Sequence, residues 1–264
     1  MANDLKKIFN EIENFSIKTD NCFEIYEKNL NRFIGKKITF VEIGVHNGGS
    51  LQMWKKYFGK KAKIIGIDIN PECKKFQDDQ IEIYIGDQSN KFFWQKFFSK
   101  VGNVDVVLDD GAHTNIAQIQ TTLSCAKNIK NDGLLIIEDT HSSYHKKYNT
   151  SKKYTFINFT KNLIDKLYKD VNSLNQKDNE YDLNQFVYSI NFYQSCVIFN
   201  INRDKTIQNK TITNNKKNQN IKDLTFQYYL NDGNNFLNKM KFTKNIQKIY
   251  KKYKTNKYLK KIFN

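Results

Sequence analysis

Short apolar runs alternate with stretches of helical periodicity over the first 200 residues of the chain. Five runs rich in Ile, Val, Leu and Phe have the length of buried strands and cover residues 38–44, 63–68, 81–87, 104–108 and 133–138. Between these runs, apolar residues recur at helical spacing; Leu51, Trp54 and Phe58 are one example. This alternation indicates βαβ units, and therefore a mostly parallel, doubly wound sheet of the α/β class.

The flanks of this core have different patterns. Residues 1–35 have helical periodicity, and residues 142–185 are polar with one helical pattern, which we interpret as an insertion over the rim of the sheet. Residues 186–199 predict two strands around a tight turn, an antiparallel hairpin that closes the sheet edge. We therefore expect a helical segment over 1–35, a sheet domain over 36–202, and a linker with a helical tail over 203–264.

Charge divides the chain at the same place. The net charge of +16 is concentrated in residues 203–264, which hold 16 Lys or Arg and three Asp or Glu, whereas the first 202 residues carry only +3. Residues 203–223 predict a linker, and residues 236–263 predict a basic amphipathic helix. The tail has three interpretations: a solvated helix, contact with an anionic membrane surface, or nucleic-acid binding. The nearly neutral core, which lacks an Asn/Asp-Pro-Pro-Tyr motif, disfavours nucleic acid.

Cysteine usage and hydropathy bear on the compartment. The four cysteines are scattered without a CxxC pair, which predicts reduced structural thiols in a cytoplasmic protein. The first 15 residues alternate charged and apolar positions and do not resemble a signal peptide. No run approaches the ~18 apolar residues of a membrane span.

Acidic residues follow the predicted strands. Asp68 ends the second run and Asp87 the third, while the fourth leads into Asp-Asp-Gly-Ala-His at 109–113 and the fifth into Glu-Asp-Thr-His at 138–141. In an open α/β sheet, the carboxyl ends of the strands are where ligands bind. Two strands that both end in paired acids and a histidine predict a divalent metal site or an acid/base site.

Simpler roles exist for some of these residues. Asp109 or Asp110 could cap the helix that begins near residue 114, and His113 could be an ordinary first-turn histidine. His141 and His145 lie near the same rim and are second-choice candidates for the catalytic base.

A glycine-containing turn follows the first strand. The pattern Glu42-x-Gly44-x-x-x-Gly48-Gly49 lies between a strand and a helix, where glycines let the backbone approach a ligand and the helix N-terminus offers free N–H groups. Asp68 is placed to accept hydrogen bonds from ribose hydroxyls. The spacing differs from the G-x-G-x-x-G of dinucleotide folds.

These motifs together resemble those of class I S-adenosylmethionine (SAM) methyltransferases. The sequences Val-Glu-Ile-Gly-Val-His-Asn-Gly-Gly-Ser at 41–50, Gly-Asp-Gln at 86–88, Leu-Asp-Asp-Gly-Ala-His at 108–113 and Ile-Glu-Asp-Thr-His at 137–141 are similar to the metal-dependent sugar O-methyltransferases of macrolide sugars and bacterial surface polysaccharides, and to the cephalosporin-hydroxylase-like group. The resemblance covers roughly residues 20–200. Ala112 departs from it, because the family form has serine there.

The resemblance implies roles for individual residues. It implies a Rossmann-like methyltransferase sheet, S-adenosyl-L-methionine as methyl donor, Mg²⁺ or Mn²⁺ held by Asp110 and Asp139 with Glu138 joining them, and His113 as general base. The residues implied to bind the cofactor are Glu42, Gly44, Asn47, Gly48, Ser50, Asp68, Asp87, Gln88 and Asp109.

Such chemistry explains the residue types. The sulfonium of SAM is already activated, so the enzyme must position an alcohol and remove its proton. A bound Mg²⁺ lowers the pKa of a sugar hydroxyl and orients it, and carboxylates are its preferred protein ligands. We therefore expect methylation of a sugar hydroxyl in surface-polysaccharide or glycoside biosynthesis, on a nucleotide-activated or lipid-linked sugar, by a homo-oligomer. The alternatives are a catechol-like vicinal diol as acceptor, or a SAM-binding protein that docks on nucleic acid or membrane.

Overall fold

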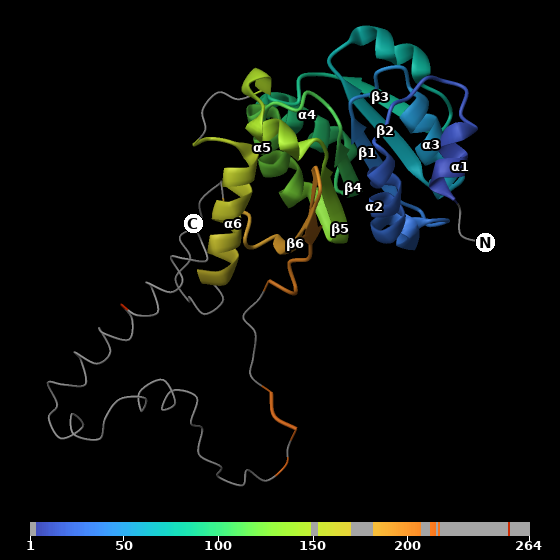
Figure 1. Cartoon of the computed structure of the whole chain (residues 1–264). Helices are drawn as coiled ribbons and strands as arrows, with labels where there is room; N and C mark the ends of the chain where they lie inside the picture. The colour runs from blue at the N-terminus through green and yellow to red at the C-terminus, as the bar shows by residue number, and fades with distance from the viewer. Residues whose placement is uncertain are drawn as a thin grey trace, which may run out of the picture. The chain divides into compact units, whose positions relative to one another are not determined.

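A computed structural model of the chain describes residues 4–148, 153–169, 182–206, 212–214, 216 and 253. The described residues form a seven-stranded sheet with the order β3-β2-β1-β4-β5-β7-β6 (Figure 1). The strands are β1 (Thr39–Ile43), β2 (Lys63–Asp68), β3 (Ile81–Ile85), β4 (Val104–Asp109), β5 (Ile129–Ile137), β6 (Val187–Tyr193) and β7 (Cys196–Ile201). Strands β1 to β5 pair in parallel, and β7 is antiparallel to both neighbours. The predicted α/β sheet with a closing hairpin is confirmed.

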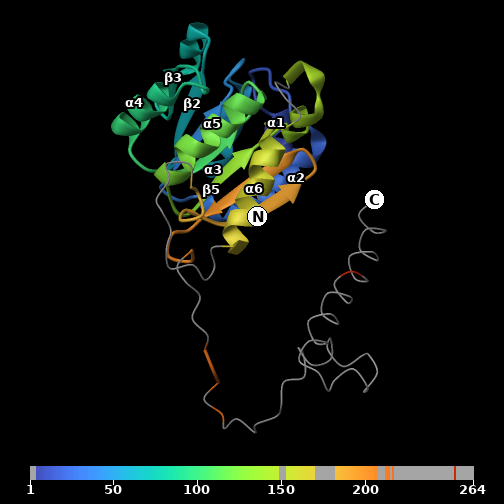
Figure 2. The ribbon, with the colours of Figure 1, turned by 90° about the vertical axis from the view of Figure 1, so that its left-hand side faces the viewer.

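Helices cover both faces of the sheet (Figures 1 and 2). One face packs against α1 (Leu5–Asn10), α2 (Asp20–Leu30) and α3 (Gly49–Phe58), and the other against α4 (Lys91–Val101), α5 (Asn115–Cys125) and α6 (Phe156–Lys169). Five short 3₁₀ segments complete the described elements: Asn31–Phe33, Pro71–Phe76, Ala126–Asn128, Thr140–Tyr144 and Lys146–Tyr148. The alternating apolar positions of the strands supply both cores, as expected for a sheet buried on two sides.

The centre of the sheet is the point where chain order reverses. Strand β1 lies between β2 and β4, so the connections after β1 and β4 run to opposite faces and leave a crevice at the carboxyl ends of the strands. Ile43 lies beside Asp109, and Asp109 beside Ile137. The strands therefore end level, which places Gly44, Asp110 and Glu138 next to one another at this rim.

The N-terminal region is less helical than its periodicity predicts. Residues 12–19 are not helical, and they connect α1 to α2 across the α3 side of the rim. The backbone N–H groups of Glu13 and Asn14 donate to the side-chain oxygen of Gln52, and the Lys56 ammonium donates to the carbonyl of Glu11. These contacts fasten the connecting segment to α3.

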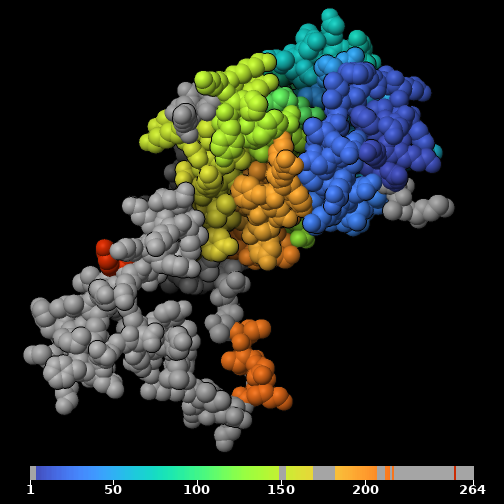
Figure 3. All heavy atoms as spheres, in the orientation of Figure 1, coloured from blue at the N-terminus to red at the C-terminus, as the bar shows by residue number. Residues whose placement is uncertain are grey.

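The second half of the sheet domain departs from the predicted boundaries at two places. Strand β5 begins at Ile129, before the predicted run at 133–138, and α5 ends at Cys125. Helix α6 was expected in an insertion over the rim, but Phe156 and Leu163 are buried in the core beside α5. Figure 3 shows the N-terminal region beside the β6–β7 hairpin, where the Asn21 amide donates to the carbonyl of Gln194.

The tail predictions fall almost wholly outside the described residues. The predicted linker is described only in part and the predicted basic helix only at residue 253. Among the described residues, no helix has the length and apolar character needed to cross a bilayer. All four cysteines are free and buried, in keeping with structural thiols.

Candidate active site

A cleft of about 770 Å³ follows the carboxyl ends of the central strands. Its walls come from the turns after β1, β2, β3, β4 and β5 and from residues 15–17 of the N-terminal connection. The predicted site residues that line it are Gly44, Asn47, Ser50, Asp68, Asp87, Gln88, Asp110, His113 and Asp139. Glu42, Gly48, Asp109 and Glu138 are not among the lining residues. One cleft therefore contains both the glycine turn and the acid–histidine group.

The glycine turn and Asp68 form one end of this cleft. Gly44 and Gly48 have φ angles of 95° and 76°, a region that L-residues with side chains rarely adopt. The Asp68 carboxylate accepts hydrogen bonds from the backbone N–H groups of Val45 and His46, at 2.9 and 3.1 Å, and from that of Asn70. Asp68 thus fixes the turn while its carboxylate remains part of the cleft wall.

The side chain of Gln88 holds the turn after β4 in place through hydrogen bonds. Its amide nitrogen donates to both oxygens of Asp109, at 3.0 Å each, and its carbonyl oxygen accepts from the backbone N–H of Ala112. Burial raises the pKa of the Asp109 carboxyl. Asp109 therefore lies in a buried network that supports the turn, whereas the neighbouring Asp87 is exposed and accepts from Ser89.

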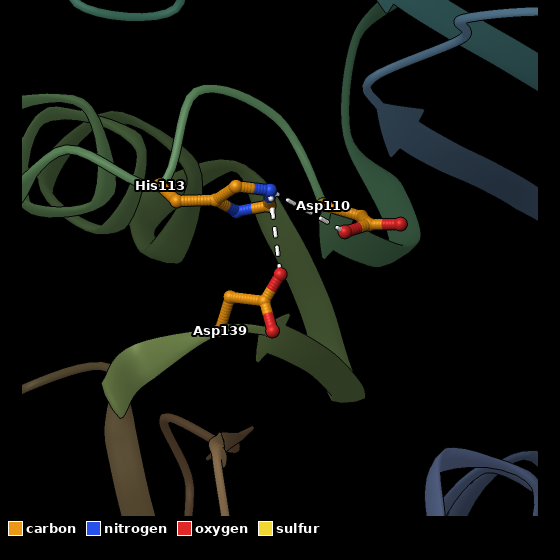
Figure 4. A group of neighbouring side chains, drawn as sticks. All are labelled: Asp110, His113 and Asp139. Carbon is orange, nitrogen blue, oxygen red and sulfur yellow. Dashed lines mark ion pairs between the residues drawn. The ribbon is translucent and has the colours of Figure 1, made fainter. Parts of the chain in front are cut away.

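Asp110, His113 and Asp139 come together from two strand ends (Figure 4). The Nε2 atom of His113 lies 3.3 Å from Oδ2 of Asp139 and 4.0 Å from Oδ1 of Asp110. One ligand atom from each of the three lies within 4.8 Å of the others. Two of these residues, His113 and Asp139, have positive φ angles of 54° and 51°. Such backbone conformations are uncommon away from glycine and concentrate at functional sites.

The capping alternatives for this turn are wrong. Thr114 is the N-cap of α5, where its hydroxyl accepts from the backbone N–H of Ala117, so neither Asp109 nor Asp110 caps the helix. His113 precedes the helix and is not part of its first turn. Its Nδ1 atom is buried without a hydrogen-bond partner among the described residues. The second-choice His141 is more exposed and pairs with the Ser195 hydroxyl.

Lys18 is a residue of this site that the sequence pattern did not predict. Its side chain is only 1 % exposed, and its ammonium lies 2.6 Å from Asp110, 3.4 Å from Glu42 and 3.4 Å from Glu138. Burial alone would lower the pKa of Lys18, but the three carboxylates raise it well above its ordinary value. No sequence signal marks this lysine, because it lies outside any motif, in the non-helical stretch of mixed polar and apolar residues between α1 and α2.

Glu42 and Glu138 face this lysine and not the cleft. Glu42 accepts from the Ser50 hydroxyl at 2.7 Å as well as from Lys18. Glu138 accepts from Lys18 and from the hydroxyl of Tyr26, which is fully buried. Burial raises the pKa of both carboxyls, against the opposing effect of Lys18. That Glu138 joins a metal site remains a prediction.

No protein-family model matches the chain. Several curated proteins are nevertheless similar to it in sequence. It is 28% identical over 153 residues to the 8-demethyl-8-alpha-L-rhamnosyl tetracenomycin-C 2'-O-methyltransferase of Streptomyces olivaceus, which covers 54% of this chain and 40% of that protein. It is 31% identical over 129 residues to the mycinamicin VI 2''-O-methyltransferase of Micromonospora griseorubida, covering 45% of this chain and 31% of that protein. The chain thus spans less than half of the length of these relatives.

Solved structures show the same fold. The MycE methyltransferase of the mycinamycin biosynthetic pathway, in complex with Mg and SAH, superposes with a TM-score of 0.69 at 22% identity, over 77% of this chain and 56% of that one. Its complex with Mg, SAH and mycinamycin VI gives 0.67 at 21% identity, over 82% and 57%. The chain therefore has the Rossmann-like fold of the SAM-dependent methyltransferases, and the relatives that its sequence matches are sugar O-methyltransferases.

Proposed function

We propose that the chain is a SAM-dependent, Mg²⁺-assisted O-methyltransferase that methylates a sugar hydroxyl of a glycoside or of a surface-polysaccharide precursor. The observation that carries this proposal is the single cleft that joins the glycine turn and Asp68 to the Asp110–His113–Asp139 group. A methyl donor at one end would then face an activated hydroxyl at the other. The names of the curated relatives, all sugar O-methyltransferases, support the choice of acceptor.

The donor set fits a divalent cation. Asp110 and Asp139 present carboxylate oxygens at the rim, and both side chains are partly exposed, at 22% and 31%. Mg²⁺ prefers oxygen ligands and keeps several positions for water or substrate, and Mn²⁺ accepts the same ligands. When bound, Mg²⁺ would lower the pKa of the acceptor hydroxyl and SAM would supply the methyl group.

The chain's own residues would position the acceptor and move its proton. His113 presents Nε2 to the space between the two aspartates, so this nitrogen is placed to accept the hydroxyl proton. Asp139, at 3.3 Å from the same nitrogen, would stabilise the imidazolium that results. Asp68 and the glycine turn would bind the donor through its ribose and its methionine part.

Release of SAH from SAM in the presence of candidate acceptors tests the proposal. The full chain is treated with a chelator and then supplied with glycosides, nucleotide-activated sugars or a catechol, with and without Mg²⁺. We expect release with a sugar that carries adjacent hydroxyls, its loss after chelation and its return with Mg²⁺ or Mn²⁺. Full activity after chelation would contradict the proposed role of the metal. Turnover of the catechol but of none of the sugars would contradict the proposal that the acceptor is a sugar.

A pair of variants separates the metal site from general charge effects. Asp139→Asn removes a proposed ligand and should abolish the Mg²⁺-dependent turnover. Asp165→Asn removes an equal charge at an exposed position of α6 and should leave turnover unchanged. Equal losses in the two variants would count against a metal role for Asp139.

A further inference from the structure

Lys18 is a buried cation inside the acidic group of the site. Its ammonium contacts three carboxylates, those of Glu42, Asp110 and Glu138, and the ring of Tyr26 lies 5.7 Å away. A buried charge is tolerated only when it is paired and hydrogen-bonded, and here each partner comes from a different strand end or turn. Lys18 therefore links the N-terminal connection to the ends of β1, β4 and β5.

The contact with Asp110 is directional. Lys18 holds Oδ2 at 2.6 Å, and Oδ1 is the oxygen that faces His113. The two oxygens of the Asp110 carboxylate therefore have different surroundings: Lys18 binds one of them, and the other faces His113. A short charge-assisted bond of this kind fixes a side chain more firmly than a neutral hydrogen bond does.

We propose that Lys18 is a positioning residue of this active site: it directs one oxygen of Asp110 to the divalent cation and, as an internal cation, limits the negative charge that the metal meets. This inference rests on the proposed function and deepens it. Lys18 itself is not among the residues that line the cleft, so it would act through Asp110 and not by contact with the acceptor.

The balance of charge at the rim sets the direction of the effect. Glu42, Asp110, Glu138 and Asp139 are four carboxyl groups at one rim, and Lys18 is the one lysine that contacts three of them among the described residues. Removal of its charge leaves the rim more negative. A divalent cation should then bind more tightly, while Asp110, released from its anchor, presents its oxygens in the wrong place for catalysis.

Two measurements on the full chain test this proposal. The first is Mn²⁺ binding, followed by the loss of the electron paramagnetic resonance signal of free Mn²⁺, and the second is turnover. In Lys18→Met we expect the Mn²⁺ dissociation constant to fall by about tenfold or more, because a positive charge near the ion is gone. We expect kcat to fall by about 100-fold, because a misplaced catalytic group loses transition-state stabilisation. Merely structural damage would lower both affinity and turnover, so opposite changes identify the proposed role.

A second variant guards against loss of folding. Lys18→Met leaves buried carboxylates without a partner, so Lys18→Met combined with Glu42→Gln and Glu138→Gln removes the unpaired charges as well. This triple variant has one negative charge fewer at the rim than the wild type, so we expect its Mn²⁺ affinity to be no higher than that of the wild type and its kcat still to be low. Wild-type turnover in either variant, or weaker Mn²⁺ binding in a folded Lys18→Met, would overturn the inference.

Mn²⁺ binding and turnover of the wild type distinguish a failure of the proposed function from a failure of the proposed role of Lys18. If the unaltered chain binds Mn²⁺ and turns over a sugar, the proposed function stands, and only the Lys18 variants decide the present inference. If the unaltered chain binds no Mn²⁺, the metal-assisted function and the role of Lys18 in it both fail.

Discussion

Gly44 lies directly against the main chain of Asp110. A Cβ atom on Gly44 would be 2.2 Å from the carbonyl oxygen of Asp110, and the Asp110 N–H donates to the carbonyl of Ile43 at 3.0 Å. The donor end and the acid–histidine end of the cleft therefore share a backbone contact. Any side chain at position 44 must push the Asp110 turn away from its place.

Substitution of Gly44 should consequently damage both ends of the cleft. In Gly44→Ala we expect the unfolding free energy to fall by about 2 kcal/mol or more, since positive φ and a backbone clash coincide. Mn²⁺ and SAH affinities should both drop in calorimetric titrations. The control is Gly35→Ala, which also has a positive φ but has no atom within 4 Å of the new Cβ. It should cost about 1 kcal/mol and leave both affinities unchanged. Similar binding losses in the two variants would contradict the argument.

Asp68 should determine the affinity for the methyl donor. Asp68→Asn replaces one charged acceptor, and we expect the affinity for SAH to fall by about tenfold, the value of a hydrogen bond to a charged group. Calorimetric titration with SAH measures this. Asp79→Asn, at a side chain that is 89% exposed and precedes the amino end of β3, is the matched control and should bind SAH as the wild type does. Unchanged affinity in Asp68→Asn would rule out the ribose contact.

His113 should matter for the chemical step and not for binding. His113→Ala removes the proposed base, so we expect kcat to fall by about 10²- to 10⁴-fold while SAH affinity is retained. Steady-state kinetics with saturating Mg²⁺ gives kcat. His145→Ala, at an exposed histidine close to the same rim, should keep wild-type kcat. Near-normal turnover in His113→Ala would exclude its role as base.

Glu42 should make stability depend on pH. Burial raises the pKa of its carboxyl above the ordinary 4.5, so the fold favours the protonated form. The contribution of Glu42 to stability is therefore fully present below pH 4.5 and is lost as pH rises through the raised folded pKa. In Glu42→Gln, urea unfolding at a series of pH values above 4.5 should show a smaller decline than in the wild type.

Glu82 provides a control of opposite sign. The hydrogen bond from Lys63 lowers the pKa of the Glu82 carboxyl, whose side chain is 41% exposed. Its small contribution is present above pH 4.5 and lost as pH falls through the lowered pKa. Glu82→Gln should change the unfolding curves only on the acidic side. A change above pH 4.5 in Glu82→Gln would contradict this assignment.

Much of the rim could be predicted because it follows from local pattern. Apolar runs that end in acids identify both the strands and the edge at which they end, so the pattern alone is enough to place Asp68, Asp110 and Asp139 in one region, and all three line the cleft. Where the pattern is weaker, the predicted boundaries differ from the observed ones: residues 12–19 are not helical, and α6 is part of a core layer.

By itself, then, the sequence determined the sheet, the glycine turn and the identity of the acids and histidine at the rim, because each depends on a short stretch of chain. Only the tertiary structure decided which way the side chains turn. It placed Asp109 in a network with Gln88, and it brought Lys18 between Glu42, Asp110 and Glu138 from 24, 92 and 120 residues away in the chain. Those contacts depend on the packing of segments that lie far apart in the chain, so no regular spacing along the sequence predicts them.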